Sequence, residues 1–242
     1  MLQQILDALQ NLSQEKKKTL VVFDLDSTLF DVSPRLERIL LDFAALPFNQ
    51  DKFPEEISLL KNAKTLRSDW GIQAALQRAG LSPQSVAFHT AVTEYWKKNF
   101  FSNHYLQFDR PYEGALEFVK AIDNLGAEIA YLTGRDVERM ETGSVEVLEH
   151  WGFPLHEHAT LVLKPHRSLD DAQFKTDWFI EKDKKNYEKI YFFENEPVNL
   201  LHLEQFCPHV EMIFFESTHA GRAAPPSHLP RIVNFLLKTK GS

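Results

Sequence analysis

The sequence predicts an α/β fold built on a parallel, doubly wound sheet, and three observations support this prediction. Five short apolar runs, rich in β-branched and aromatic residues, have the length and composition of strands buried on both faces. Helical patterns separate the later runs, and such alternation is typical of parallel sheets with right-handed crossovers. Polar residues follow several runs directly, as expected at the ligand-binding edge of this kind of sheet.

The elements follow in chain order. The expected strands cover residues 20–23, 129–132, 160–163, 190–193 and 212–215, and the expected helices between them cover 112–125, 137–151 and 174–186. An amphipathic helix should come first, because apolar residues recur at helical spacing over positions 2–12; we expect it to dock on the core. A last helix is predicted to start near Ser227, after Pro225 and Pro226, and to run to Lys238.

One long segment breaks the alternation. Residues 33–108, here called the helical insert, hold helical patterns at 36–43, 57–66, 72–79 and 86–100, separated by prolines. The segment is too long for a crossover between strands. We therefore expect a core made of residues 1–32 and 109–242, with the helical insert 33–108 as a second unit. A helical domain of unrelated use is the alternative.

Composition narrows the functional classes. The 242-residue chain has a net charge of −7, which argues against nonspecific nucleic-acid binding, because phosphate backbones attract clustered Lys and Arg. The single cysteine, Cys207, excludes an intramolecular disulfide and disfavours a zinc cluster. No run approaches the roughly 20 apolar residues of a membrane-spanning helix, and the N-terminus does not resemble a signal peptide. We expect a cytoplasmic protein without membrane contact; the oligomeric state is left open.

Polar side chains that could take part in catalysis or bind a metal gather at the predicted carboxyl ends of three strands. They are Asp24 and Asp26 after the first strand, Thr133 and Gly134 after the second, and Glu194 and Asn195 after the fourth, with Lys164 and Lys175 as candidate cations. Because these strand ends should meet at one edge of the sheet, we expect the side chains to converge there.

This set of residue types suits phosphoryl chemistry. One carboxylate of the Asp24–Asp26 pair could attack phosphorus, and the other could protonate the leaving oxygen and later deprotonate water. Asp26 as an acid needs a raised pKa, because an ordinary aspartate is almost fully ionised at neutral pH. Oxygen ligands favour Mg²⁺, which could bridge Asp24, the phosphoryl group and Glu194. Thr133 and a lysine would stabilise the oxygens where charge builds up.

Four segments resemble, in order, the motifs of the haloacid dehalogenase superfamily. Residues 22–29 resemble the first motif, an apolar strand followed by Asp-x-Asp-x-Thr, and residues 130–134 resemble the second, an apolar strand ending in Thr or Ser. Lys175 resembles the third-motif lysine, and residues 190–195 resemble the acidic fourth motif. The resemblance implies a Rossmann-like core with a mobile helical cap, a position that residues 33–108 would fill, and hydrolysis of a small phosphorylated metabolite.

The resemblance also implies a role for each matching residue. Asp24 resembles the nucleophile and a metal ligand, and Asp26 resembles the acid/base, with its backbone carbonyl on the metal. Thr133 and Lys175 resemble the residues that hold the phosphoryl group, together with Gly134. Glu194 resembles the acidic Mg²⁺ ligand, with Asn195 as a neutral oxygen ligand beside it.

Two departures from the pattern leave questions open. The fourth motif usually carries two acidic residues or Gly-Asp, so Asn195 predicts weaker metal binding, which Asn195→Asp should strengthen. Lys164 follows a strand directly and is a rival to Lys175 for the third-motif role. Arg135 could contact substrate, although we expect an ion pair with Asp136 at the surface. Trp70, Tyr95 and Trp96 are expected to belong to the core of the helical insert.

Other functions remain possible on the same residues. A phosphotransferase or mutase would use the same intermediate with water excluded, and a non-catalytic phosphate-binding module is suggested only by Asn195. Dehalogenases of this superfamily lack the second carboxylate of the first motif, whereas Asp26 is present here. Phosphonate hydrolysis by the superfamily's route needs a cap lysine, and no lysine of the insert stands out.

Overall fold

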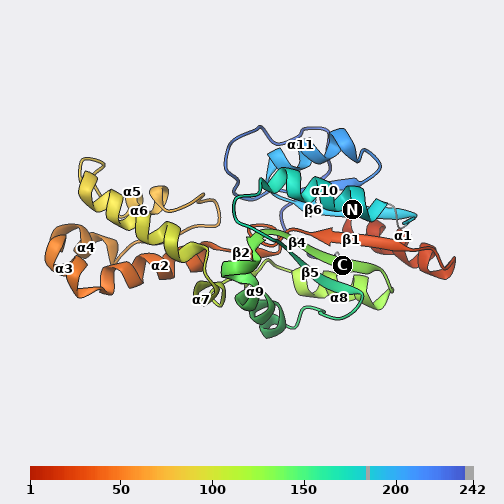
Figure 1. Ribbon diagram of the computed structural model, residues 1–242, viewed down its shortest axis with the longest axis horizontal. Helices are drawn as coiled ribbons and strands as arrows, with labels where there is room; N and C mark the ends of the chain where they lie inside the picture. Colours follow the sequence, from red (N-terminus) through yellow and green to blue (C-terminus); the bar gives the residue numbers. More distant parts are fainter. Residues whose placement is uncertain (184–185, 238–242) are drawn as a thin grey trace, which may run out of the picture.

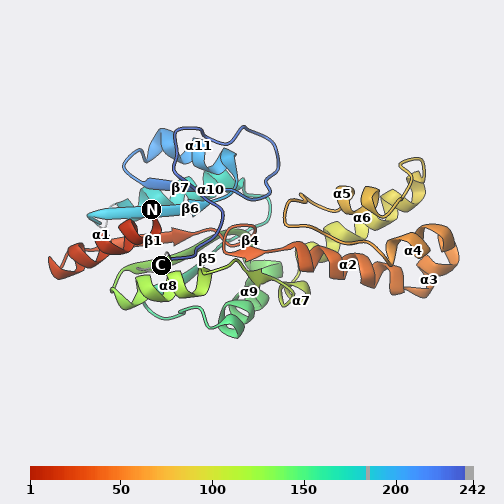
Figure 2. The same ribbon diagram turned by 180° about the vertical axis from the view of Figure 1, so that it is seen from behind.

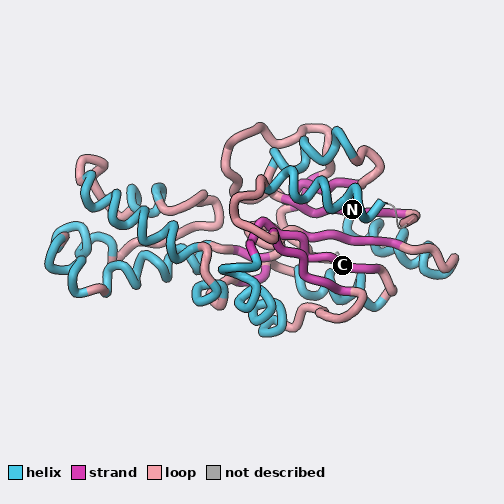
Figure 3. Tube along the Cα trace, viewed as in Figure 1, coloured by secondary structure: helices cyan, strands magenta, loops and turns pink. Residues whose placement is uncertain are grey.

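A six-stranded parallel sheet forms the centre of the molecule in the computed structural model, which describes residues 1–183 and 186–237. Its strands are β1 (Thr19–Phe23), β4 (Glu128–Asp136), β5 (Ala159–Lys164), β6 (Lys189–Glu194), β7 (Glu211–Phe215) and β8 (Arg231–Ile232). The spatial order is β5-β4-β1-β6-β7-β8, with every neighbouring pair parallel. The predicted α/β class with a doubly wound sheet is therefore confirmed (Figure 3).

Helices cover both faces of this sheet (Figures 1 and 2). One face packs against α1 (Leu2–Gln14), α8 (Ala115–Asn124) and α9 (Val137–Trp151), and the other against α10 (Asp171–Asp183) and α11 (Pro197–Phe206). Alternate residues of β1 point to opposite faces: Val21 and Phe23 enter one apolar cluster, and Leu20 and Val22 the other. This explains the continuous apolar run of the sequence, because each side chain of the strand is buried.

The helical insert lies beyond one end of the sheet, drawn in orange and yellow in Figure 1. Its helices are α2 (Ser33–Ala45), α3 (Pro47–Lys52), α4 (Pro54–Leu60), α5 (Gln73–Arg78), α6 (Val86–Phe100) and α7 (Asn103–Leu106). They enclose an apolar cluster of their own, separate from the two clusters on the sheet. The chain leaves and re-enters the core through two paired antiparallel strands, β2 (Phe30–Asp31) and β3 (Arg110–Pro111).

The C-terminal segment differs from the prediction. Instead of a helix from Ser227, residues 227–237 form turns and the short strand β8, which pairs with β7. Pro230 adds a third helix-breaking residue to this segment, and Phe235 is fully buried with its ring stacked on Phe215 at 5.1 Å. The backbone of Phe235 passes so close to Gly114 that a Cβ there would lie 2.6 Å from it. Lys238, the predicted helix end, lies outside the described residues.

The other elements match the predictions with shifted ends. Helices α6 and α9 have the predicted bounds, whereas α4 ends at Leu60, six residues before the predicted end. Helix α10 begins at Asp171, three residues early, and the predicted range reaches past positions 184–185, which lie outside the described residues. Among the described helices, none has the combination of length and apolar character needed to cross a membrane.

Candidate active site

The turn after β1 fixes Asp24 at the edge of the sheet. The backbone N–H of Asp24 donates to the carbonyl of Phe193 on β6, which prolongs the pairing of the two strands by one residue. Ser27 has a φ of 62°, a left-handed conformation that reverses the chain directly after the aspartates. Thr28 Oγ1 then donates to Asp24 Oδ2 at 3.1 Å, so the motif holds its own first carboxylate in place.

Lys175, on α10, lies between two carboxylates from neighbouring strands. Its Nζ is 2.6 Å from Asp24 Oδ1 and 2.6 Å from Glu194 Oε2. Glu194 is completely buried at the end of β6, and its other oxygen accepts the backbone N–H groups of Asn195 and Glu196. We call Asp24, Lys175 and Glu194 the lysine cluster; their formal charges sum to −1.

This charge shortage is visible in the pKa of Asp24. Burial and the charge of Glu194 raise the pKa of Asp24, Lys175 opposes both effects, and the resulting pKa is about 7. The pKa of Lys175 is itself raised, because the attraction of Asp24 and Glu194 outweighs the effect of its burial. The lysine cluster is therefore short of positive charge before any ligand binds.

Asp26 belongs to a second group of buried charges. Its Oδ1 accepts hydrogen bonds at 2.6 Å from Nη2 of Arg35 on α2 and at 2.6 Å from Nη2 of Arg135 at the end of β4. Both guanidinium groups also bind the fully buried Asp109, at 2.5 and 2.8 Å. We call these four residues the arginine cluster; its two positive and two negative charges balance.

At this cluster one requirement from the sequence analysis is not met, and one expectation is wrong. Burial would raise the pKa of Asp26, but the charges of Arg135 and Arg35 together hold it well below its usual range, so the raised pKa that an acid needs is not found. Arg135 is buried rather than at the surface and does not pair with Asp136. Asp136 instead caps α9 by accepting the N–H of Arg139 and also binds its guanidinium.

Thr133 and Gly134 lie within β4, which continues four residues past its predicted end, and they line the same cavity as Asp24. Thr133 is buried, and its Oγ1 accepts the N–H of Arg135 at 3.3 Å. A Cβ at Gly134 would lie 2.6 Å from a carboxylate oxygen of Asp171. That carboxylate also accepts from Lys164 Nζ at 2.5 Å, so the structure places Lys175, and not Lys164, against Asp24.

The loop after β6 is held by side-chain amides. Asn195 Oδ1 accepts from Thr28 Oγ1 at 3.0 Å, and Asn195 Nδ2 donates to the carbonyl of Thr218 at 2.6 Å. Asn199 Nδ2, on α11, donates to Glu194 Oε2 at 2.9 Å and so ties the start of that helix to the end of β6. Within the described residues, Asn199 Oδ1 and Glu196 Oε1 are buried oxygens without a hydrogen-bond partner.

These residues can be tested for their fit to Mg²⁺. Within the described part of the chain, no three His, Cys, Asp or Glu side chains group around a common metal position. The carboxylate of Asp26 faces the arginines, which leaves Asp24 and Glu194 as the acidic donors. The donors are nevertheless all oxygen atoms, the lysine cluster is short of positive charge, and two buried oxygens nearby lack partners. The chemistry of the donor set therefore fits a hard divalent cation.

The site opens into a cavity of about 450 Å³ that lies between the core and the helical insert. The core contributes Asp24, Thr133 and Lys175 to its lining, and the insert contributes mainly aromatic side chains. Trp70 was expected in the core of the insert, but it is 60% exposed and lines this cavity. Trp96 both packs against the core of the insert and lines the cavity.

Comparison with known proteins agrees with this architecture. A protein-family model described as a haloacid dehalogenase-like hydrolase matches residues 18–152, more than half of the chain. The chain belongs to the haloacid dehalogenase-like hydrolase family. The matched region includes Asp24, Asp26 and Thr133 and ends before Lys175 and Glu194. No curated protein sequence gives a significant match.

Solved structures show the same fold at low sequence identity. A HAD-superfamily hydrolase from Ehrlichia chaffeensis is 13% identical, with a TM-score of 0.50 over 90% of this chain and 93% of the other. A HAD-superfamily hydrolase of subfamily IA from Geobacter sulfurreducens is 14% identical, with a TM-score of 0.51 over the same shares. At these identities the likeness concerns the fold alone.

Several residues of this hydrolase site were not predicted from the sequence. Arg35 and Asp109 lie 74 positions apart and carry no motif, so no sequence signal linked them to Asp26. Thr28 was part of the quoted first motif, and its spacing from Asp24 could have indicated the hydrogen bond. The stretch 218–222, which lines the cavity beside Asn195, follows the last predicted strand and was overlooked.

Proposed function

We propose that this hydrolase cleaves small phosphomonoesters with Mg²⁺, through an aspartyl-phosphate intermediate on Asp24. An Asp24 oxygen would bond to phosphorus while the bond from phosphorus to the leaving alcohol oxygen breaks. Water would then attack the phosphorus, releasing inorganic phosphate and the free Asp24 carboxylate. The observation that carries the proposal is Lys175 Nζ, which lies 2.6 Å from Asp24 Oδ1 in a cavity of substrate size.

Lys175 and Thr133 would stabilise the transferred group. Both side chains are buried and line the cavity with Asp24. Because they are shielded from solvent, water screens the charge of Lys175 and the dipole of Thr133 only weakly. Donors held in advance at positions where negative charge develops lower the barrier to phosphoryl transfer. The backbone at Gly134 lines the same wall and would complete the phosphoryl pocket with them.

Mg²⁺ would be held by Asp24 and Glu194, with the carbonyl of Asp26 and the side chain of Asn195. When bound, it would supply positive charge that lowers the pKa of Asp24 and offsets the repulsion between carboxylate and phosphate. Asp24 has a pKa of about 7 without a cation, so the added charge would increase the ionised fraction of this nucleophile near neutral pH.

Asp26 would act on protons at the leaving-group side of the cavity. Paired with two arginines it is an anion, which is the form that accepts a proton from the attacking water. To donate a proton to the leaving alcohol, Asp26 would have to separate from one guanidinium. Arg35 belongs to the helical insert, so its position would change if the insert moved relative to the core.

Hydrolysis of an aryl phosphate with and without Mg²⁺ tests the proposal. We expect Mg²⁺-dependent turnover in the wild type, and a loss on the order of 10³-fold or more in Asp24→Asn, since the variant retains the shape but not the nucleophile. Analysis of products with added alcohols separates hydrolysis from phosphoryl transfer. Turnover that persists in Asp24→Asn, or that needs no divalent cation, would contradict the mechanism.

A further inference from the structure

The helical insert covers the candidate site with aromatic side chains. Trp70, Trp96, Phe100 and Phe101 all line the cavity that contains Asp24 and Lys175. Ring centroids of Trp96 and Phe100 are 5.9 Å apart, and those of Phe100 and Phe101 are 5.0 Å apart. We call these four residues the aromatic wall.

Neighbouring groups hold the aromatic wall in place. The guanidinium carbon of Arg35 lies 4.5 Å from the centre of the Phe100 ring, so the arginine cluster supports that ring from the core side. Gly71, next to Trp70, borders the Trp96 ring, and a Cβ there would be in ordinary van der Waals contact with it at 3.5 Å. Arg35 therefore supports the Phe100 end of the wall, and Trp96 lies beside the backbone that carries Trp70.

Two features of the aromatic wall are unexplained by the fold. Trp70 is 60% exposed although it lines a cavity, so a large apolar surface remains open there. The Nε1–H of Trp96 is buried and, within the described residues, has no hydrogen-bond acceptor. A buried donor without an acceptor is costly, and a bound ligand with an acceptor atom would satisfy it.

Charge is unevenly distributed across the cavity. The core side carries Asp24, Lys175 and Glu194, whereas the one carboxylate of the insert in the lining, Asp69, is bound by Arg78 and by the N–H of Leu66. The insert side therefore offers flat aromatic faces, with the buried N–H of Trp96 as a donor that lacks an acceptor within the described residues. A ligand matching both sides has a phosphoryl group at one end and a planar ring at the other.

We propose that the cavity binds phosphomonoesters whose alcohol part carries an aromatic ring with a hydrogen-bond acceptor for Trp96. This inference rests on the proposed function, because the phosphoryl end is placed at Asp24. The ring of the ligand stacks on the aromatic wall, in which Trp70 presents the most exposed face. The acceptor atom of the ligand accepts a hydrogen bond from Nε1–H of Trp96. The size of the ester is limited by the cavity volume of about 450 Å³.

Direct binding tests the aromatic wall independently of turnover. Phenethylphosphonate and butylphosphonate carry the same anionic group and differ in the ring, so we expect phenethylphosphonate to bind about tenfold more tightly in the presence of Mg²⁺. Trp70→Ala should bring the ratio of the two dissociation constants close to one. Phe48→Ala is the matched control, because Phe48 is a 69% exposed aromatic residue of the same insert that does not line the cavity.

The acceptor is tested with Trp96→Phe, which keeps an aromatic ring but removes the N–H donor. Pyridylethylphosphonate, measured at mildly alkaline pH where the pyridine is neutral, should bind several-fold more tightly than phenethylphosphonate to the wild type. In Trp96→Phe this advantage should disappear. An advantage that persists in the variant would overturn the role given to Trp96.

Parallel hydrolysis assays separate the two proposals. Phenethyl phosphate and butyl phosphate both release a primary alcohol as the leaving group. A difference in kcat/KM between the two esters therefore reports binding of the ring and not leaving-group reactivity. Equal binding of the two phosphonates, binding of neither, or equal loss of both in Trp70→Ala would overturn the ring preference. Hydrolysis of both esters without preference would leave the proposed function standing and refute this inference. Preferential binding of the ring-bearing phosphonate without hydrolysis of either ester would support the ring preference and refute the proposed function.

Discussion

Two aspartates only two residues apart are in opposite electrostatic states. Asp24 belongs to the lysine cluster, where two carboxylates share one cation, and its pKa is raised to about 7. Asp26 belongs to the arginine cluster, where two carboxylates share two cations, and its pKa lies well below the usual range. Burial alone would raise both. The number of cations facing each carboxylate decides the outcome.

The two clusters also connect different parts of the molecule. The lysine cluster joins β1, β6 and α10, all within the core, and it lacks one positive charge. The arginine cluster joins the turn after β1 and the end of β4 to Arg35 on α2 of the helical insert. One cluster is therefore prepared to receive a cation and a phosphoryl group, and the other is already neutral and ties the insert to the core.

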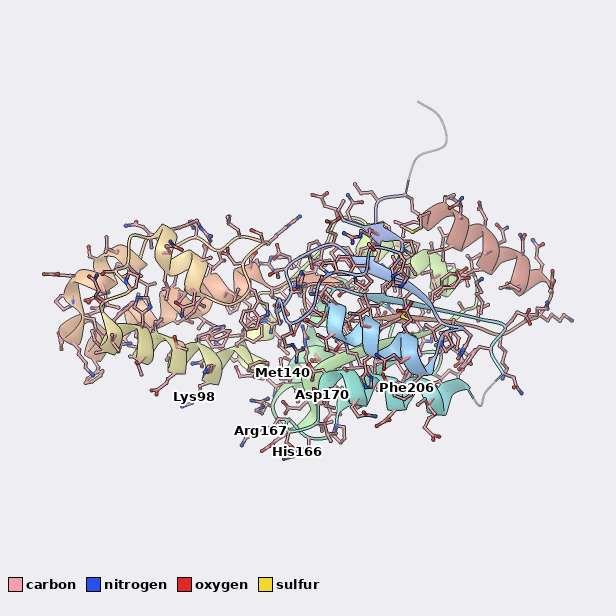
Figure 4. All side chains as sticks on the ribbon, turned by 90° about the horizontal axis from the view of Figure 1, so that it is seen from above. Lys98, Met140, His166, Arg167, Asp170 and Phe206 are labelled. Carbon is pink, nitrogen blue, oxygen red and sulfur yellow. The ribbon has the colours of Figure 1, made fainter. Side chains whose placement is uncertain are left out.

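A view from above shows how the helical insert meets the core. The helical insert, with Lys98 of α6 on its outer side, extends from the core in Figure 4. His166 and Arg167, in the loop before α10, lie at the outer edge of the core, and Asp170 lies beside that helix. The insert thus contacts the core over a limited region, and the arginine cluster lies within that region.

Removing the cation of the lysine cluster should have the largest effect. In Lys175→Met we expect kcat to fall on the order of 10² to 10³-fold, because the positive group that faces the developing phosphoryl charge is lost. Steady-state kinetics with an aryl phosphate measure this. Lys164→Met removes a lysine of similar burial that binds Asp171 instead, and it should change kcat little. A larger loss in Lys164→Met than in Lys175→Met would reverse our assignment of the two lysines.

Breaking the arginine cluster should act on stability. Arg35→Met leaves Asp109 fully buried with one guanidinium fewer, and we expect the free energy of unfolding to fall by about 3–5 kcal/mol. Urea denaturation measures this value. Arg38→Met is the control, because Arg38 is half exposed and pairs with Asp42 one turn along α2, which is worth roughly 0.5 kcal/mol at most. Equal losses in the two variants would mean that the buried pairing contributes nothing beyond a surface pair.

Much of this arrangement could be predicted from the sequence, and the limits have physical causes. Apolar runs of strand length located five of the six strands, and the meeting of parallel strand ends placed Asp24, Thr133 and Glu194 together. The arginine cluster was not predictable, because charged side chains that pair over 74 positions leave no periodic pattern. The exposure of Trp70 was missed for a related reason, since Trp70 lies between two predicted helices, where no periodic pattern shows which way a side chain faces.

The predicted C-terminal helix shows a different limit. The segment that was expected to be a helix instead pairs β8 with β7 and buries Phe235 against Phe215. Local propensity gave way to tertiary packing.

The smallest expected effect concerns the helix cap beside the clusters. Burial would raise the pKa of Asp136, but its hydrogen bond and charge interaction with Arg139 lower the pKa overall. A lowered folded pKa contributes stability above the ordinary pKa of 3.8, and this contribution is lost as pH falls through the folded value. Asp136→Asn keeps the cap and removes the charge, so unfolding free energies measured from pH 6 downward should show a slightly weaker acid dependence, roughly as for a single exposed ion pair. An unchanged slope would show that the Arg139 pairing does not affect stability.

Trapping the covalent intermediate tests the central claim most directly. Asp24, with its raised pKa and its lysine, should carry the phosphoryl group, and Asp26, held by two arginines, should not. Borohydride reduces an aspartyl-phosphate to homoserine, so the enzyme quenched during turnover with Mg²⁺ and then digested can be sequenced by mass spectrometry. We predict homoserine at position 24 only when substrate and Mg²⁺ are both present. Homoserine at position 26, or rapid hydrolysis without homoserine at either position, would contradict the account.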